Sequence, residues 1–283
     1  MSASDPNAGQ FDLWNNASGD TWAKYQEQLD RQLGRIGWRT VEPLKLQPGE
    51  RVLDVGCGAG ATTLDLARIV GAKGSATGLD ISDTLLGVAR EREPKPGSAK
   101  VQWLSADAQT YAFRANAFDA IYSRFGVMFF DDPRAAFANL RGATRDGGRL
   151  SFACWRSLAD NPWMTLPLKA VGDLVEAPPR PAPGSPGPFA FADEAHVQGI
   201  LDDSGWRDVR IEAFDSPMGG GDLDSTAELM TRVGLLGVAL REAGADRYMT
   251  QTAEDMVREA LEPFQREGGV FVPSATWIVT ARA

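Results

Sequence analysis

The sequence predicts an α/β fold: a seven-stranded, mostly parallel sheet with an antiparallel last strand, plus a helical cap. Two observations support this class. From Glu50 to Trp155, short apolar runs alternate with amphipathic segments, and strand–helix–strand repeats make crossover connections between parallel strands. After Trp155, the helical segments exceed what such a sheet needs, so the excess is expected to form the cap.

The first five strands are short apolar runs with helix signals between them. They are expected at 51–55, 75–80, 101–107, 118–124 and 148–155. Ser82 can cap the helix that follows the second strand. Asp132 before Pro133 places an N-cap residue ahead of a proline in the first helical position, and Phe137 and Leu140 then share one face. These signals predict helices that alternate with the strands.

One amphipathic helix is expected before the sheet, at residues 20–37. Its apolar stripe is formed by residues spaced three and four apart, namely Trp22, Tyr25, Leu29, Leu33 and Ile36. We therefore predict that residues 1–45 form an N-terminal helical lid, and that residues 46–156 form a ligand-binding core.

The second half of the chain departs from this alternation. A helix is expected at 162–176, and six prolines among residues 178–188 predict an irregular loop, so 157–190 is assigned to the cap and this loop. Residues 191–283 should complete the sheet. They contain a helix capped by Asp193, strands at 206–214 and 275–283, and two cap helices, at 224–243 and 252–266, inserted within about 216–268.

Composition and charge exclude several classes of protein. The formal charge is -9, which argues against a nucleic-acid partner. No apolar run approaches the roughly 18 residues of a membrane span, and the first residues lack a secretory signal, so a cytoplasmic location is expected. Cys57 and Cys154 match no metal-ligand spacing. We expect two buried thiols, no disulfide and no metal.

A glycine-rich turn, "DVGCGAG" at residues 54–60, follows the first strand. Gly56, Gly58 and Gly60 allow a tight turn close to a ligand at the carboxyl ends of the strands. With Ala61 the turn also satisfies the dinucleotide pattern G-x-G-x-x-A, and Asp80 lies at the distance expected for a ribose partner. An NAD(P)-dependent oxidoreductase is therefore one reading of the motif.

Two further acids favour a different ligand. Asp54 lies two residues before the first glycine, where a carboxylate would repel a pyrophosphate but suit a cation; it could instead tie down the turn. Asp107 ends the third strand, 27 residues after Asp80, and could instead cap the short segment that follows. Acids at three successive strand ends are hard to explain by packing, so they indicate a binding site.

Together these motifs resemble those of the class I S-adenosylmethionine-dependent methyltransferases. The resemblance rests on "DVGCGAG", Asp80, "SADA" at 105–108, and the stretch from "FDAIYSRFGVMFFDDP" to "DGGRLSF". It is strongest to the type 11 group, which includes the ubiquinone and menaquinone C-methyltransferases. It implies a Rossmann-like fold, S-adenosylmethionine as cofactor, and methyl transfer to O, N or C of a small, partly apolar metabolite. A catalytically inactive ligand-binding relative is a further alternative.

The resemblance also implies where the methionine and ribose parts of the cofactor would lie. Asp54 and the turn that contains Gly56, Cys57, Gly58 and Gly60 would hold the methionine end. Asp80 would accept hydrogen bonds from both ribose hydroxyls, and Ile81 would lie against the adenine face.

The remaining cofactor contacts implied by the resemblance involve the adenine, the amino group and the lid. Asp107 would accept a hydrogen bond from the adenine amino group, while the Ala108 amide reads the ring edge. Ser123 would offer its backbone carbonyl to the cofactor's amino group. Trp14 or Trp22 would close the pocket, although packing explains these two residues equally well.

The sequence offers few candidates for catalysis. Methyl transfer needs alignment and exclusion of water, but no dedicated base. Arg124 could orient an acidic or carbonyl acceptor, and the aromatic residues beside it could flank the sulfonium and an apolar acceptor. Core or cap packing explains Phe125, Met128 and Phe129 equally well. His196 is the only histidine, and an exposed helical position explains it better than catalysis does. The expected partner is a small-molecule acceptor, with homodimer formation left open.

Overall fold

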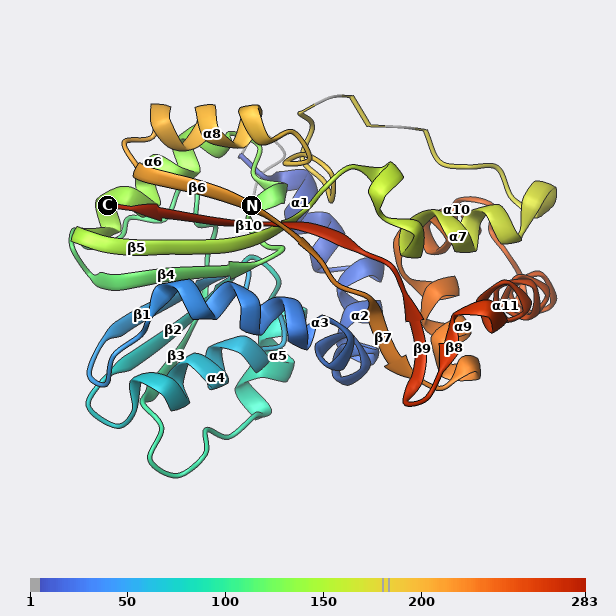
Figure 1. The fold of residues 1–283 in the computed structure, drawn as a ribbon, viewed down its shortest axis with the longest axis horizontal. Helices are drawn as coiled ribbons and strands as arrows, with labels where there is room; N and C mark the ends of the chain where they lie inside the picture. The colour runs from blue at the N-terminus through green and yellow to red at the C-terminus, as the bar shows by residue number, and fades with distance from the viewer. Residues whose placement is uncertain (1–5, 180, 183) are drawn as a thin grey trace.

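A seven-stranded sheet forms the larger part of the molecule, on the left in Figure 1. The computed structural model describes residues 6–179, 181–182 and 184–283. In sheet order the strands are β3 (Lys100–Ser105), β2 (Ser75–Asp80), β1 (Arg51–Val55), β4 (Phe118–Arg124), β5 (Thr144–Trp155), β10 (Ala275–Arg282) and β6 (Arg207–Asp215). β10 pairs antiparallel with both β5 and β6, whereas β1 to β5 pair in parallel. The predicted sheet, including its antiparallel last strand, is confirmed.

The strand order reverses between β1 and β4, which places a crevice at their carboxyl ends. The segments that follow β1 and β4 leave the sheet there in very close contact. A Cβ atom on Gly56 would lie 2.6 Å from the Cα of Gly126, and one on Gly126 would lie 2.6 Å from the Val55 carbonyl oxygen. Both positions therefore require glycine, and the close approach shapes the floor of the crevice.

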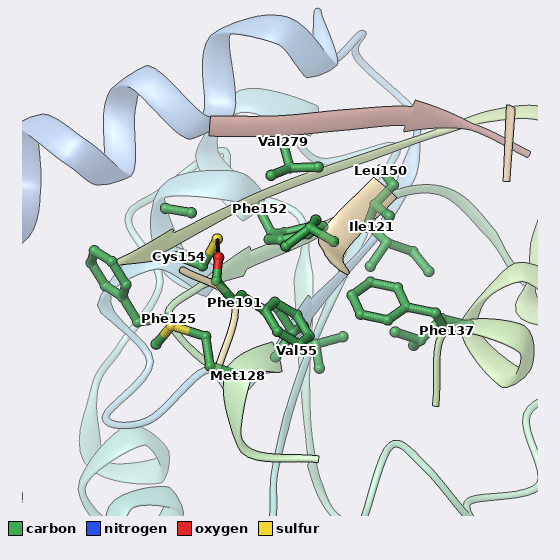
Figure 2. Close-up of a cluster of buried hydrophobic side chains, with 14 of the residues drawn as sticks. Val55, Ile121, Phe125, Met128, Phe137, Leu150, Phe152, Cys154, Phe191 and Val279 are labelled. Carbon is green, nitrogen blue, oxygen red and sulfur yellow. Dashed lines mark hydrogen bonds between the residues drawn. The ribbon is translucent and has the colours of Figure 1, made fainter. Parts of the chain in front are cut away.

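Helices cover both faces of the sheet (Figure 1). They are α4 (Ala61–Val70), α5 (Asp83–Glu91), α6 (Pro133–Ala143) and α8 (Glu194–Asp203). The predicted caps are confirmed, because the side chains of Ser82, Asp132 and Asp193 accept hydrogen bonds from amides in the first turn of their helices. Figure 2 shows Phe137 of α6 close to Phe152 of β5 within the buried core.

Three helices precede the sheet, so the single helix expected at 20–37 is wrong. They are α1 (Ala8–Trp14), α2 (Ala17–Lys24) and α3 (Gln26–Val41). The helical path is interrupted at Tyr25, whose hydroxyl donates a hydrogen bond to Glu228 of the cap. Leu29, Leu33 and Ile36 keep their place in one buried stripe of α3. The interruption lets α2 run in a different direction from α3.

The cap consists of four helices and a small sheet, to the right of the main sheet in Figure 1. Its elements are α7 (Pro162–Ala170), α9 (Leu223–Arg232), α10 (Gly234–Glu242), α11 (Arg247–Leu261), β7 (Met218–Gly221), β8 (Gln265–Arg266) and β9 (Gly269–Val272). It has its own buried cluster, which includes Leu236, Val257 and Val270.

The sequence located these cap helices only approximately. The helix expected at 224–243 divides into α9 and α10, because Gly234 adopts a φ of 70° that an α-helix cannot accommodate. The helix expected at 252–266 starts earlier, where Asp246 caps α11, and ends at Leu261. The helix expected at 162–176 ends at Ala170. The three-stranded sheet was not predicted, because its strands are two to four residues long.

Short 3₁₀ turns complete the secondary structure. They are Glu42–Leu44, Val127–Phe129, Leu158–Asp160, Gly172–Leu174 and Glu262–Phe264. Cys57 and Cys154 are both free and buried, as predicted. Within the residues described above, no helix is both long enough and apolar enough to cross a membrane.

Candidate active site

A cavity of about 360 Å³ lies at the carboxyl ends of β1, β2 and β4. The N-terminal helices and the cap also contribute to its walls. On the sheet side it is lined by Gly56, Cys57, Gly58, Asp80, Ile81, Asp107 and Ala108. On the cap side, most of the lining is aromatic, aliphatic or methionine side chains. This brings together most of the residues that the sequence assigned to cofactor binding.

The glycine turn gives the cavity one bare wall, but its glycines have different functions. The Gly58 amide donates to Asp80 Oδ2 at 2.7 Å, and a Cβ atom on Gly58 would meet only Leu85, at 4.0 Å. Gly60 does not line the cavity: a Cβ atom there would lie 2.5 Å from the Trp103 ring. Gly58 is thus the glycine that leaves room for a ligand, whereas Gly60 allows helix α4 to pack against β3.

Asp80 is held in place at the end of β2 by two backbone amides. Oδ1 accepts a hydrogen bond from Ser82 N at 2.8 Å, and Oδ2 accepts one from Gly58 N at 2.7 Å. Burial raises the pKa of this carboxyl group above its usual value. Each carboxylate oxygen can accept a further hydrogen bond, so the fixed side chain can bind two hydroxyl groups from the cavity.

Asp107 faces the same cavity and has an unexpected partner, Asn7. The Asn7 Nδ2 atom donates to Asp107 Oδ2 at 2.9 Å and to Gln109 at 3.0 Å. The Asn7 Oδ1 atom accepts a hydrogen bond from the Asp131 amide at 2.6 Å. The buried Asn7 side chain therefore ties the start of α1 to two loops at the sheet edge.

Asp54 lies beneath the glycine turn, outside the cavity lining. Its Oδ2 atom accepts hydrogen bonds from Thr62 at 2.6 Å and Thr63 at 2.7 Å, which ties the turn to helix α4. The other carboxylate oxygen, Oδ1, is buried and has no partner. Burial raises the pKa of Asp54 to about 6. The arrangement fits the expectation that Asp54 ties down the turn, and it leaves one buried carboxylate oxygen without a partner.

Ser123 lies outside the cavity, at the end of β4. Its hydroxyl donates to the Val55 carbonyl at 2.8 Å and accepts from the Gly126 amide at 3.2 Å. The next turn places Phe125 at a φ of 62°, where its ring stacks on Trp155 with 4.0 Å between centroids. The side chain of Ser123 thus joins β4 to β1, and the turn that it supports presents aromatic groups to the cavity.

Trp14 and Trp22 both line the cavity and also pack against neighbouring aromatic rings. Their rings meet edge to face at 5.7 Å, and Trp14 makes a similar contact with Phe129 at 5.4 Å. Ser82 Oγ donates to the Trp14 carbonyl at 2.5 Å. The N-terminal helices therefore close the cavity with an aromatic wall that is anchored next to Asp80.

The two candidates for catalysis lie in different surroundings. Arg124 lines the cavity, but its Nη2 atom is 2.8 Å from Asp30 Oδ1, so its charge is already compensated. His196 lies in the first turn of α8, half-buried, with its ring near Phe191. His196 does not line the cavity, because α8 packs against α6 and β6 rather than over the crevice. Its position on α8 therefore agrees better with a helical surface residue than with a catalytic one.

Sequence reasoning missed several residues of the site. Those on the cap side come from α7, β7, α9 and α10, and include Trp163, Met164, Met218, Met230, Arg232 and Arg241. Tryptophans at 155 and 163 were the one available signal, because two large aromatic residues close together after a core strand suggest a shared wall. Asn7 carried no signal, since a single asparagine near the N-terminus is ordinary.

The cavity contains few groups able to move a proton. Among the described residues that line it, the acids are Asp30, Asp80 and Asp107, and there is no histidine or glutamate. No group of three or more potential metal ligands occurs in the described ranges.

Comparison with known proteins identifies the central domain. Residues 53–152 match the family described as a methyltransferase domain. Aklanonic acid methyltransferase DauC from Streptomyces sp. (strain C5) is 31% identical over 148 residues, which is 52% of this chain and 62% of DauC. The ubiquinone/menaquinone biosynthesis C-methyltransferase UbiE of Teredinibacter turnerae is 38% identical over 133 residues, 45% of this chain and 53% of UbiE.

Solved structures show the same fold. The crystal structure of a putative methyltransferase from Bacillus halodurans superimposes with a TM-score of 0.56 at 16% identity. The superposition covers 88% of this chain and 99% of the Bacillus halodurans chain. By contrast, the chain matches only about half the length of the curated relatives.

The sheet order, the glycine turn and the acids at the strand ends define a class I S-adenosylmethionine-dependent methyltransferase domain. Within this class, residues 53–152 match the type 11 group, and S-adenosylmethionine is the cofactor of this domain. The predicted fold class is confirmed, and the predicted family and cofactor are confirmed for the domain at residues 53–152.

Proposed function

We propose that the protein transfers the methyl group of S-adenosylmethionine to O, N or C of a small, largely apolar acceptor. One observation carries this proposal: a single cavity joins Asp80 and Asp107 on the sheet side to aromatic and methionine side chains on the cap side. A cofactor and an apolar acceptor can therefore meet in one space.

The residues present fit the cofactor. Asp80 offers two fixed carboxylate oxygens for the ribose hydroxyls, and Gly58 leaves open space beside it. Ile81 and Ala108 provide apolar contacts for the adenine, next to Asp107. The unpartnered Oδ1 of Asp54 suits a positively charged amino group, directly or through a water. This last feature would be unfavourable next to a pyrophosphate, which argues against a nicotinamide cofactor.

When bound, S-adenosylmethionine supplies an electrophilic methyl group on a positively charged sulfur. The chain's part is to align the acceptor and to exclude water. Aromatic faces such as those of Trp14 and Phe129 attract cations and bury apolar surface at the same time. Trp155 and Trp163, 4.8 Å apart between centroids, extend the same aromatic wall toward the cap.

The scarcity of bases in the cavity limits the kinds of acceptor group that could be methylated. Asp30, one of the acids that line the cavity, already forms ion pairs with Arg92 at 3.1 Å and with Arg124 at 2.8 Å. Asp80 and Asp107 are occupied with positioning bonds and with the proposed cofactor contacts. We infer that the acceptor atom is one that reacts without a dedicated protein base, such as an oxygen or carbon that ionises near neutral pH.

Calorimetric titration tests the proposal. S-adenosylmethionine and S-adenosylhomocysteine should both bind, and NADH should not. Transfer of a labelled methyl group should then be measured across a panel of phenols and of aromatic and aliphatic carboxylic acids and amines. Binding of NADH in place of S-adenosylhomocysteine would reject the proposal. Binding without transfer to any member of the panel would favour the catalytically inactive relative.

A further inference from the structure

The cap places two arginines in the cavity wall that neither the cofactor contacts nor the described ion pairs account for. Arg232 ends helix α9, and Arg241 lies in the last turn of α10. Both line the cavity. Their charge is of interest because the surrounding cap lining is apolar and includes Met230, Val233 and Val238.

Arg232 is half-buried and lacks a compensating partner. Its Nε atom is buried and makes no hydrogen bond, and no carboxylate of the described residues lies within 4.0 Å of its guanidinium. Two acids, Glu228 and Glu254, lie nearby, but neither carboxylate comes within 4.0 Å of the Arg232 guanidinium. Glu228 accepts a hydrogen bond from Tyr25 and lies 3.8 Å from Lys24, while Glu254 interacts with Arg232 only at longer range.

Arg241 is more exposed, and it lies directly beside Arg232. Its Nη1 atom donates to the Arg232 carbonyl at 3.2 Å, and it likewise has no carboxylate partner among the described residues. Partial burial lowers the pKa of Arg241 relative to its usual value. Two arginines thus line the cap side of an apolar cavity, with the Arg241 guanidinium against the backbone of Arg232 and no carboxylate of the described residues within 4.0 Å of either side chain.

Three other arginines in or near the cap are compensated. Arg258 pairs with Asp224 at 2.6 Å, Arg156 pairs with Asp215 at 2.9 Å, and Arg124 pairs with Asp30. In a molecule with a net charge of -9, leaving two adjacent cations unpaired beside a cavity is unexpected. Burial of an uncompensated charge costs free energy, so such a group usually has a partner that arrives from outside the chain.

We propose that the methyl acceptor carries an anionic group, a carboxylate, that binds to Arg232 and Arg241 while its apolar body lies against the aromatic and methionine side chains. Guanidinium groups bind carboxylates through paired, charge-assisted hydrogen bonds. The site would orient the acceptor from its cap end, opposite Asp80 and Asp107. This inference rests on the proposed function and adds the chemical class of the acceptor.

Matched pairs of probes test this inference by calorimetry in the presence of saturating S-adenosylhomocysteine. The probes are 2-naphthoate with 2-naphthamide, and anthraquinone-2-carboxylate with its carboxamide. Each pair differs in charge but hardly in shape. The wild-type protein should prefer at least one carboxylate over its amide by about tenfold or more, as expected for charge-assisted hydrogen bonds. Equal binding within both pairs, or binding of no carboxylate, would overturn the inference.

Two variants test whether Arg232 and Arg241 cause the preference for the carboxylate. Arg232→Met and Arg241→Met keep an unbranched apolar stem but remove the guanidinium group, and each should reduce the preference for the carboxylate to less than about threefold. Arg247→Met is the matched control, because Arg247 is an exposed arginine of the same cap that does not line the cavity, and it should retain the preference. An unchanged preference in both cavity variants would contradict the assignment.

The affinity for S-adenosylhomocysteine alone separates the remaining outcomes. It should be unchanged in both cavity variants, because the proposed role concerns the acceptor. A parallel loss of this affinity would show that the arginines bind the carboxylate of the cofactor, which would overturn the inference. If the wild-type protein binds no S-adenosylhomocysteine, the proposed function itself fails.

Discussion

The Asn7 side chain links the N-terminal helices to Asp107 through a 2.9 Å hydrogen bond that spans 100 residues of sequence. The same carboxamide also bonds Gln109 and the Asp131 amide. These contacts lie at the edge of the cavity where the adenine of the cofactor is expected. Asn7 is therefore placed to hold α1 closed over that end of the site.

Replacement of Asn7 by alanine should weaken binding of S-adenosylhomocysteine about tenfold. The change removes three hydrogen bonds and leaves the Asp131 amide without its partner, so the closed position of α1 becomes less favourable. Calorimetric titration measures the effect. Asn16→Ala is a suitable control, because Asn16 is an exposed asparagine of the same segment whose side chain bonds only the Asp12 carbonyl. Tighter binding by Asn7→Ala would instead mean that Asn7 competes with the ligand for Asp107.

Asp80→Asn should reduce the affinity for S-adenosylhomocysteine by about tenfold to a hundredfold. An amide can accept hydrogen bonds only through its one oxygen, whereas Asp80 accepts from two amides and is assigned both ribose hydroxyls. The melting temperature should also fall, because the backbone amide of either Gly58 or Ser82 would then face the NH2 group of the new asparagine and lose its acceptor. Asp83→Asn, which changes an exposed acid three residues away, should alter neither quantity. Undiminished affinity in Asp80→Asn would show that the ribose site is assigned wrongly.

The sequence predicted the sheet side of the site well, because that side depends on local chemistry. A glycine turn, an acid at the end of β2 and an acid after β3 are each recognisable within a few residues, and parallel topology brings them to one edge. The cap side depends on packing between distant segments. Arg232, Met218 and Trp163 meet there only because β7, α7 and α9 fold over the crevice, and no local pattern encodes that arrangement.

The same distinction explains the errors within predicted elements. The apolar spacing from Trp22 to Ile36 fits one helix, but the contact of Tyr25 with Glu228, 203 residues away, accompanies an interruption. His196 was weighed as a base because it is the only histidine, yet its position on α8 keeps it from the cavity. Composition indicated which residues could act, whereas the topology determined which of them reach the site.

Alanine substitutions should separate the roles of the glycines in the turn. Gly60→Ala should lower the free energy of unfolding by about 3 kcal/mol or more, since positive φ costs about 1–2 kcal/mol and the new methyl group also collides with Trp103. Gly58→Ala meets open space, so only the backbone cost of about 1–2 kcal/mol is expected, together with weaker cofactor binding.

Urea unfolding measures these differences in stability, and calorimetry measures cofactor affinity. Gly49→Ala serves as the control for backbone strain alone, because Gly49 also has a positive φ, 93°, with nothing within 4 Å of the added methyl group. Equal destabilisation by all three substitutions would show that contact with Trp103 does not constrain Gly60.

Asp54 should make stability depend on pH in an unusual direction. Burial raises its pKa from 3.8 to about 6, so between these values the folded protein binds a proton that the unfolded chain releases. The contribution of Asp54 to stability is complete below pH 3.8 and is lost as the pH rises through about 6, with a total of about 3 kcal/mol. Asp54→Asn should remove this dependence, so the difference in unfolding free energy between the two proteins should change across this window and be constant above it.

Cofactor binding should show the opposite trend if the unpartnered oxygen of Asp54 faces a positively charged amino group. A cation nearby favours the ionised carboxylate and lowers the pKa of Asp54, so binding releases a proton at low pH. The affinity for S-adenosylhomocysteine should therefore rise as the pH increases to about 6 and then level off, whereas Asp54→Asn should lack that contribution. Titrations at pH 5, 6, 7 and 8, repeated in buffers with different ionisation enthalpies, measure both the affinity and the proton release. An identical pH profile in wild type and Asp54→Asn would show that Asp54 only secures the turn to helix α4.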